Sequence, residues 1–426
     1  MGNENLQVEK NKNRGWVVTF AGTGINLALG VLYSWSILSG EITGWTQTMK
    51  SVPYSIACGV FALAMVPAGR LQDRVSPRFA ATIGGVLTGA GFILCAIAPT
   101  YVGFMIGFGL LAGIGIGFGY AAATPPAIKW FPSQKTGLIT GVVVAGFGLA
   151  SAYIGPLGRW MLGLFGLQTT MLVLGICFLA VVVILAQLLR NPPLGFVPGP
   201  APKMPVQRKS GGATLEGSPS IEPSQMIRTS RFWLLWIMFA CGAGSGLMII
   251  GKLKPIVQGA SGLAWFAPLC LAFLAIGNAS GRILAGLLSD RIGRTLTMLM
   301  IFLCQAGVMV CLVLFGKVAS FVFILSFFAG FNYGANLSIF PSAAKDLFGL
   351  KNFGTNYGIL FTAWGFGGVV LPILAGKVAD ATGNFNLAYV IAAFCLLVAA
   401  ALTFVVRNGD RKTSWVPARK PLSVEG

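Results

Sequence analysis

The amino-acid sequence predicts an all-α membrane protein in which twelve transmembrane helices form two pseudo-symmetric six-helix bundles. Three observations carry this prediction: an apolar composition, twelve long stretches with almost no charge, and a repeat that relates the two halves. Of the 426 residues, 55% are hydrophobic and only 10% are charged, whereas soluble globular chains carry about 25% charged residues. This composition excludes disordered chains and nucleic-acid-binding proteins, although the net charge is +19.

Each charge-poor stretch is near the length of roughly 20 residues that a helix needs to cross about 30 Å of hydrocarbon. The first stretch is too long for a signal peptide and follows a polar start, so we expect it to remain in the mature chain. The predicted spans are 16–38, 51–69, 79–98, 101–128, 137–158, 168–189, 231–251, 264–288, 295–315, 319–340, 353–376 and 384–406.

The positions of lysine and arginine predict the orientation of these spans. Of the 30 basic residues, 23 lie in the termini and even-numbered loops, with Arg231 at the start of span 7 counted in the preceding loop; six lie in the odd-numbered loops, and Arg282 lies deep inside a span. Because basic residues concentrate on the cytoplasmic side, both termini are expected in the cytoplasm. The basic excess therefore reflects topology, and attraction to the anionic lipid bilayer is a secondary effect.

Composition also divides the chain. The segment between spans 6 and 7 is rich in proline, glycine, serine and lysine, which is typical of a flexible linker. The predicted parts are a cytoplasmic tail (1–15), a six-helix bundle (16–189), a cytoplasmic linker (190–230), a second six-helix bundle (231–406) and a cytoplasmic tail (407–426).

Three short segments of the first bundle return in the second at nearly constant separation. This indicates a duplicated six-helix unit. The pairs are 69–74 with 286–291, both G-x-L-x-D-R, then 117–120 with 330–333, and 131–132 with 340–341.

These paired loops, the six-plus-six spans and the central linker resemble the major facilitator superfamily. Segments 33–35, 129–132, 228–233 and 356–358 further resemble its monocarboxylate transporter family, and are most similar to the bacterial branch, which includes lactate transporters and oxalate:formate antiporters. The resemblance implies a monomeric transporter of the bacterial inner membrane, not an enzyme, in which two bundles rock about a midplane site. It implies lactate or pyruvate as substrate, with a proton as co-substrate.

The duplicated loops predict a charge network that latches the bundles. Each has an aspartate beside arginines, near the positively polarised start of the next helix. Positive-inside topology alone is the alternative, and it explains the arginines but not the repeated aspartates. The candidate gating residues are Asp73, Arg74, Arg78, Asp290, Arg291 and Arg294.

Arg282 is the main candidate for binding substrate. An arginine inside an apolar span costs at least about 2.5 kcal/mol, and such residues usually face a water-filled path or a partner. Asn278, four residues earlier, shares its helix face, and a guanidinium beside a carboxamide suits a carboxylate. The resemblance implies the same role. The alternative is that Arg282 extends to the cytoplasmic surface.

Four further residues are candidates for lining the site. Tyr120 and Tyr333 are related by the repeat and lie well inside their spans, where each offers a hydroxyl and a ring. The alternative is that they are interfacial tyrosines. Leu29 and Tyr33 share a face of span 1 and could supply an apolar wall, although ordinary helix packing explains them equally well.

The sequence also bears on coupling and selectivity. No acidic residue lies within a span beside Arg282, so the proton either travels with the substrate or uses an edge group such as Glu41 or Asp380. Trp364 stands where the resemblance to oxalate:formate antiporters implies a second cation, which favours monocarboxylates. An organic anion exchanger remains the alternative function.

Because the chain has no histidine and its eight cysteines lack metal-ligand spacing, no metal or cofactor is expected.

Overall fold

The computed structural model describes residues 2–132, 136–193, 196, 221–261, 266–349 and 352–413, with all of their side chains except those of 2–12, 73, 136, 137, 261 and 407–413. Within these ranges every element is helical. The all-α prediction is therefore confirmed, while most of the predicted linker and the end of the C-terminal tail lie outside the described residues.

The first half of the molecule, α1 to α7, contains several irregular helical segments. Its first crossing changes from α-helix to a tighter 3₁₀ turn around Tyr33, and its fourth contains a π-helical stretch (η3). The elements are α1 (Gly2–Leu29), η1 (Gly30–Ser34), α2 (Trp35–Leu38), η2 (Ser39–Glu41), α3 (Gln47–Arg74), α4 (Pro77–Ile97), α5 (Tyr101–Phe104), η3 (Met105–Ala112), α6 (Gly113–Ile128) and α7 (Thr136–Ala186).

The second half, α9 to α14, consists of longer uninterrupted helices and is preceded by the single turn α8. Its elements are α8 (Pro223–Met226), α9 (Ser230–Ser261), α10 (Ala267–Ile292), α11 (Arg294–Phe315), α12 (Ala319–Phe348), α13 (Phe353–Thr382) and α14 (Asn386–Thr413).

Eleven described helical stretches are long and apolar enough to cross a membrane. One of them, α7, is 51 residues long and contains Gly166 in a non-helical conformation, with φ 71° and ψ 179°. A positive φ of this kind is readily adopted only by glycine. α7 is therefore two helices joined at Gly166, and they correspond to the predicted spans 137–158 and 168–189.

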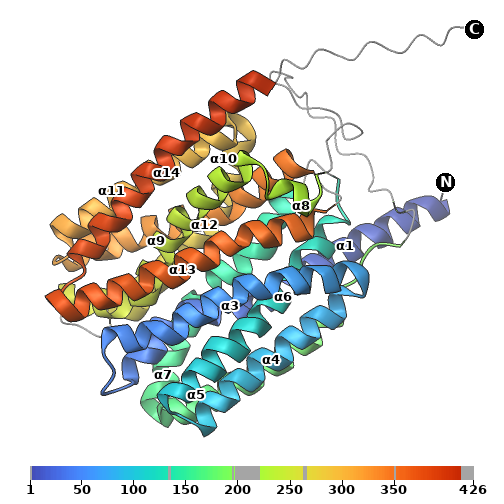
Figure 1. Ribbon diagram of the computed structural model, residues 1–426. Helices are drawn as coiled ribbons and strands as arrows, with labels where there is room; N and C mark the ends of the chain where they lie inside the picture. The colour runs from blue at the N-terminus through green and yellow to red at the C-terminus, as the bar shows by residue number, and fades with distance from the viewer. Residues whose placement is uncertain are drawn as a thin grey trace, which may run out of the picture.

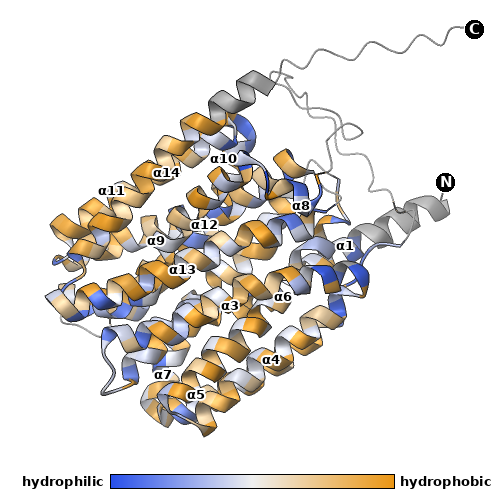
Figure 2. Ribbon diagram, viewed as in Figure 1, coloured by the Kyte–Doolittle hydropathy of each residue, from blue (hydrophilic) through white to orange (hydrophobic). Residues whose placement is uncertain are grey.

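α1 begins and α14 ends at the same end of the bundle, which we name the terminal end (Figure 1). The outer faces of the helices are largely hydrophobic and polar residues gather toward the two ends (Figure 2). Large apolar side chains such as Leu314, Phe394 and Ile97 are 66%, 67% and 74% exposed. Such a surface suits lipid rather than water, as expected of a multi-pass membrane protein.

The halves meet through two helix pairs, α3 with α13 and α7 with α10. Inside the second half, α10 and α12 approach closely through glycines four residues apart on each helix. A Cβ atom added to Gly281 would lie 2.0 Å from the Phe331 carbonyl oxygen, and one added to Gly334 would lie 2.0 Å from that of Asn278. Small residues at this spacing let membrane helices pack backbone to backbone, and here they fix the turn of α10 that carries Asn278 and Arg282.

Candidate functional site

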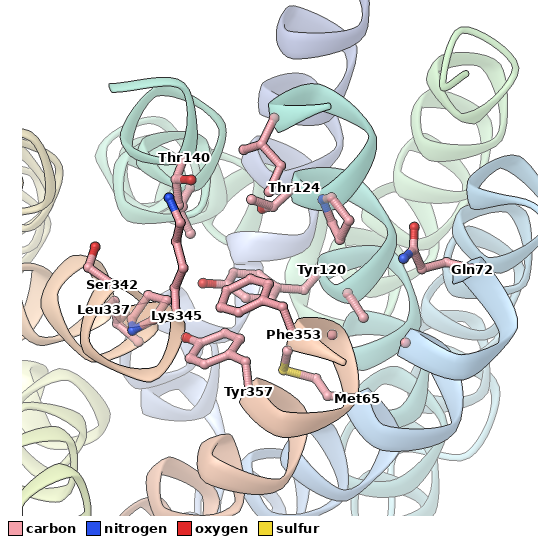
Figure 3. Close-up of a pocket in the computed structure, with 17 residues that line it drawn as sticks. Met65, Gln72, Tyr120, Thr124, Thr140, Leu337, Ser342, Lys345, Phe353 and Tyr357 are labelled. Atoms are coloured by element: carbon pink, nitrogen blue, oxygen red, sulfur yellow. The ribbon is translucent and has the colours of Figure 1, made fainter. Parts of the chain in front are cut away.

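A cavity of about 820 Å³, including its open mouth, lies between the two halves. Five helices line it, α3, α6, α7, α12 and α13, and on most of them the lining residues recur every four positions, so each helix contributes one face. The outermost residues lie near the ends of these helices at the terminal end, so the cavity opens there. Figure 3 shows the side chains that line it. Its side chains include Met65, Tyr120, Thr124, Thr140, Leu337, Lys345, Phe353 and Tyr357.

Arg282 lies behind the inner part of this cavity and is only 1% exposed. Its Nε donates to Asn278 Oδ1 at 2.9 Å, and Nη1 donates to the carbonyl oxygen of Val144, a cavity residue, at 2.5 Å. Arg282 therefore bridges the two halves. It does not extend to the surface, contrary to the alternative raised by its position in the sequence.

Two donors at this place are unused. Arg282 Nη2 and Asn278 Nδ2 are buried and have no hydrogen-bond partner among the described residues. Buried polar groups are nearly always paired, so unpaired donors need an explanation. A guanidinium and a carboxamide that each offer a free N–H can together hold the two oxygens of a carboxylate.

Four tyrosines lie near the Arg282 guanidinium. Tyr120 lies close enough to interact with it directly, and Tyr33, Tyr333 and Tyr357 are within electrostatic reach. The hydroxyls of Tyr33 and Tyr333, from opposite halves, are 2.6 Å apart. The repeat-related tyrosines predicted from the sequence thus lie near the same arginine, one on each half.

Aromatic rings pack around Tyr120 behind the cavity. Phe61, Phe147 and Phe361 pack against the Tyr120 ring with centroid distances of 5.4, 5.4 and 5.8 Å. Trp364 is fully buried and donates its indole N–H to the Tyr333 hydroxyl at 2.8 Å. The site thus combines a few polar groups with an apolar wall, the usual composition of a pocket for a small organic molecule.

The two residues predicted on span 1 differ in their surroundings. Tyr33 joins the site through its bond to Tyr333, whereas Leu29 fills the space left by Gly119, whose added Cβ would lie 2.2 Å from Leu29 Cδ1. The helix tightens to 3₁₀ geometry directly after Leu29, so the two residues are not on one regular α-helical face. Leu29 supports the segment that carries Tyr120.

The described charge pairs of the duplicated loops lie in the second half. Arg294 pairs with Asp290 at 2.6 Å and with Asp346 at 3.0 Å, while Arg291 is exposed. In the first half, Arg78 Nε donates to the Leu189 carbonyl oxygen at 3.0 Å and Arg74 is exposed. The Asp73 side chain lies outside the described residues. Asp290 also borders α7 of the first half, beside Leu138 and Gly141.

A polar cluster at the opposite end of the molecule was not expected from the sequence. Lys252 and Lys254 follow the predicted span 231–251 and were expected in a loop, but α9 continues to Ser261 and both lysines are buried. The apolar residues Ile256 and Val257 beyond them were a signal that the helix continues. Arg282 is therefore not the only buried cation in the described chain.

This cluster joins the halves where the cavity does not open. Lys254 Nζ pairs with Glu41 at 2.9 Å, and Lys252 Nζ donates to the Gln47 carbonyl oxygen at 2.5 Å. Asp380 accepts hydrogen bonds from the backbone N–H groups of Gln47 and Thr48 at 3.0 and 2.9 Å.

Tyr357, which lines the cavity, was also not expected from the sequence. The regular spacing of the aromatic residues Phe353, Tyr357 and Phe361 along α13 was a signal for it.

Comparison with known proteins identifies the family. The family model described as "Major Facilitator Superfamily" matches residues 15–325 and 300–424. An Escherichia coli (strain K12) protein described as the uncharacterized MFS-type transporter YhjX is 30% identical, over 84% of this chain and 87% of its own length. The oxalate:formate antiporter of Oxalobacter formigenes is 26% identical, over 94% of this chain and 93% of its own length. Monocarboxylate transporter 13 of Bos taurus is 25% identical over 97% and 96%.

A crystal structure of a bacterial homolog of the human lysosomal transporter Spinster, in an inward-facing and unoccupied conformation, has the same fold. Its TM-score is 0.67 with 16% identity, over 96% of this chain and 99% of that one. Together with the two helical halves and the cavity between them, these matches show that the chain belongs to the major facilitator superfamily, with monocarboxylate transporters and an oxalate:formate antiporter among its relatives.

Proposed function

We propose that the protein carries small monocarboxylates, such as lactate and pyruvate, across the bacterial cytoplasmic membrane by alternating access and together with a proton. Both termini then lie in the cytoplasm, as the distribution of basic residues predicts, and the cavity opens to the cytoplasm. The observation that carries the proposal is the pair of unused donors, Arg282 Nη2 and Asn278 Nδ2, buried beside the cavity.

The chemistry of the site supports a single carboxylate with a short apolar tail. One oxygen would accept from Arg282 and the other from Asn278, while the tail would contact the Tyr120, Phe361 and Trp364 rings. A second carboxylate would have no cation there, because Trp364 is apolar and burying an unpaired ion costs several kcal/mol.

A proton that accompanies the substrate needs a group to carry it. Among the described residues, no acidic side chain pairs with Arg282. We therefore expect the proton to travel on the substrate carboxyl, or on Glu41 or Asp380 at the opposite end.

Uptake of labelled lactate into proteoliposomes tests the proposal. An inward proton gradient, with the interior alkaline, should accelerate uptake several-fold, and collapsing the gradient with a protonophore should remove the acceleration. Liposomes without protein are the control. Absence of saturable lactate and pyruvate uptake would refute the monocarboxylate assignment.

An organic anion exchanger is the second candidate, favoured by the 26% identity to the oxalate:formate antiporter and by the absence of an acid beside Arg282 in the described chain. The same liposomes distinguish the two. If the uptake rate does not depend on the proton gradient but rises when unlabelled carboxylate is loaded inside the liposomes, the protein is an exchanger.

A further inference from the structure

The cavity contains a second cation that the proposed site does not use. Lys345, on the last turn of α12, lines the cavity near its mouth. In Figure 3 its side chain points across the gap between the halves toward Thr140 of α7. The ammonium group thus faces a space that any anion must cross to reach Arg282 from the terminal end.

Lys345 lies nearer the mouth of the cavity than the inner site does. Tyr333, Leu337, Pro341 and Lys345 follow one another at intervals of four and form one face of α12. Twelve residues of helix separate Tyr333 from Lys345, which corresponds to ~18 Å at about 1.5 Å per residue. The Lys345 side chain points toward Thr140, which lies one turn of α7 from Val144, whose carbonyl oxygen accepts from Arg282, so the two cations face successive levels of the cavity.

No described carboxylate neutralises Lys345. Its sequence neighbour Asp346 is engaged by Arg294 of α11 at 3.0 Å, and the other described ion pairs involve Glu41 and Asp290. The described polar side chains near the mouth are instead neutral: the hydroxyls of Thr140, Thr124 and Ser342 and the amide of Gln72. A hydroxyl can donate a hydrogen bond to a carboxylate, but it is neutral and cannot neutralise the charge of a lysine ammonium group.

We propose that Lys345, with the Thr140 hydroxyl, forms a second carboxylate-binding station at the mouth of the cavity, where substrate pauses between the cytoplasm and Arg282. This inference rests on the proposed function for the identity of the substrate. The inferred site at Lys345 is separate from the site at Arg282 and binds anions more weakly.

A weak outer site suits a transport path. Lys345 is only half-buried, so water and salt screen its attraction, whereas Arg282 is 1% exposed. Conduction requires binding that is favourable enough to admit an ion and weak enough to release it. A cation at the mouth also raises the local concentration of anions and speeds their association.

The first test measures binding without transport. Saturation-transfer NMR of lactate with purified Arg282→Gln protein in detergent should detect a weak, saturable and salt-sensitive signal that remains when the inner site is lost. Adding Lys345→Gln should weaken this residual binding about three- to tenfold. Adding Lys129→Gln instead should leave it unchanged, because Lys129 is an exposed lysine at the same end that donates to Asn191 Oδ1 at 3.4 Å.

The second test measures association kinetics with Arg282 intact. Stopped-flow tryptophan fluorescence should show lactate associating about three- to tenfold more slowly with Lys345→Gln than with the unaltered protein. The dependence of this rate on salt should weaken, and Lys345→Arg should restore both properties.

The proposal is overturned if Lys345→Gln leaves both the residual binding and the association rate unchanged. It is also overturned if that change destroys binding as fully as Arg282→Gln does, because Lys345 would then belong to the inner site. Failure of the proposed function looks different: the unaltered protein would carry no lactate, while the weak binding that depends on Lys345 would persist.

Discussion

At the scale of single residues, the candidate site is defined by the small set of hydrogen bonds that Arg282 makes. Arg282 is held by Asn278 and by one backbone carbonyl, and it retains one free donor. The sequence could indicate both residues because a charge inside an apolar span is rare and a spacing of four places two side chains on one helix face. It could not indicate Val144, whose backbone oxygen is brought to Arg282 only by packing of the other half.

Replacing Arg282 by glutamine should lower the affinity for lactate more than tenfold. The lost charge-assisted hydrogen bond is worth about 1.5–3 kcal/mol. Isothermal titration of the purified variant would measure the change, with thermal unfolding as a check on folding. The exposed Arg228→Gln provides a matched control. Unchanged lactate affinity in Arg282→Gln would show that the buried guanidinium does not bind substrate.

Trp364→Lys should improve the binding of oxalate. The tryptophan is fully buried and contacts Tyr333, so a lysine there would supply the cation that a second carboxylate lacks. We expect oxalate to compete with labelled lactate at least about threefold better. Trp364→Phe, which adds no charge, is the control. The idea fails if oxalate already displaces lactate from the unaltered protein as well as pyruvate does.

At the scale of elements, the pair α10 and α12 fixes the position of the site. Gly277 and Gly281 on one helix, and Gly330 and Gly334 on the other, allow backbone contact beside Asn278. The glycines are visible in the sequence, but their partners are not, since which helices pack together depends on the whole bundle. The charge-poor stretches likewise predicted the extent of most spans, but the span 231–251 ends before Lys252 because a charged residue was treated as its boundary.

Gly334→Ala should destabilise the protein and weaken substrate binding together. The added methyl group would lie 2.0 Å from the Asn278 carbonyl oxygen, and overpacking of this kind costs about 1–3 kcal/mol. Thermal unfolding in detergent and lactate titration would measure both effects. Gly307→Ala on α11, where nothing lies within 4 Å of the added atom, should lose neither stability nor binding. Equal behaviour of the two variants would argue against close packing as the constraint.

At the scale of the whole molecule, the cavity between the two halves opens at the terminal end, and polar contacts join the halves at the other. The cavity opens where α3, α6, α12 and α13 have their terminal ends, while Lys254 with Glu41, and Asp380 with Thr48, connect the halves at the opposite end. Alternating access requires these connections to break when the cavity closes at the terminal end. They therefore stabilise the present conformation.

Glu41→Gln should shift the protein toward the conformation that is open at the opposite end. Lys254 is 5% exposed and would lose its carboxylate, and a buried unpaired cation gains hydration when that end opens. Because Glu41 itself is half-exposed, we expect about 1 kcal/mol, or roughly fivefold in population.

Distances between spin labels at the opposite-end tips of α3 and α13 would report this shift. Lys317→Gln, an exposed change of charge at the same end, serves as the control. An unaltered distance distribution in Glu41→Gln would show that the ion pair does not hold this end closed.

The sequence by itself determined the membrane class, the spans, the division into related halves, and Arg282 with Asn278 as the candidate anion site. These properties are local: they follow from apolar runs, charge and spacing along one helix, which one chain segment reveals. Tertiary structure decided which end is open, that Tyr33 meets Tyr333, that Lys252 and Lys254 are buried, and that Lys345 faces the cavity. Each of these depends on packing one half against the other, where the partners lie a hundred or more residues apart and leave no periodic signal in the sequence.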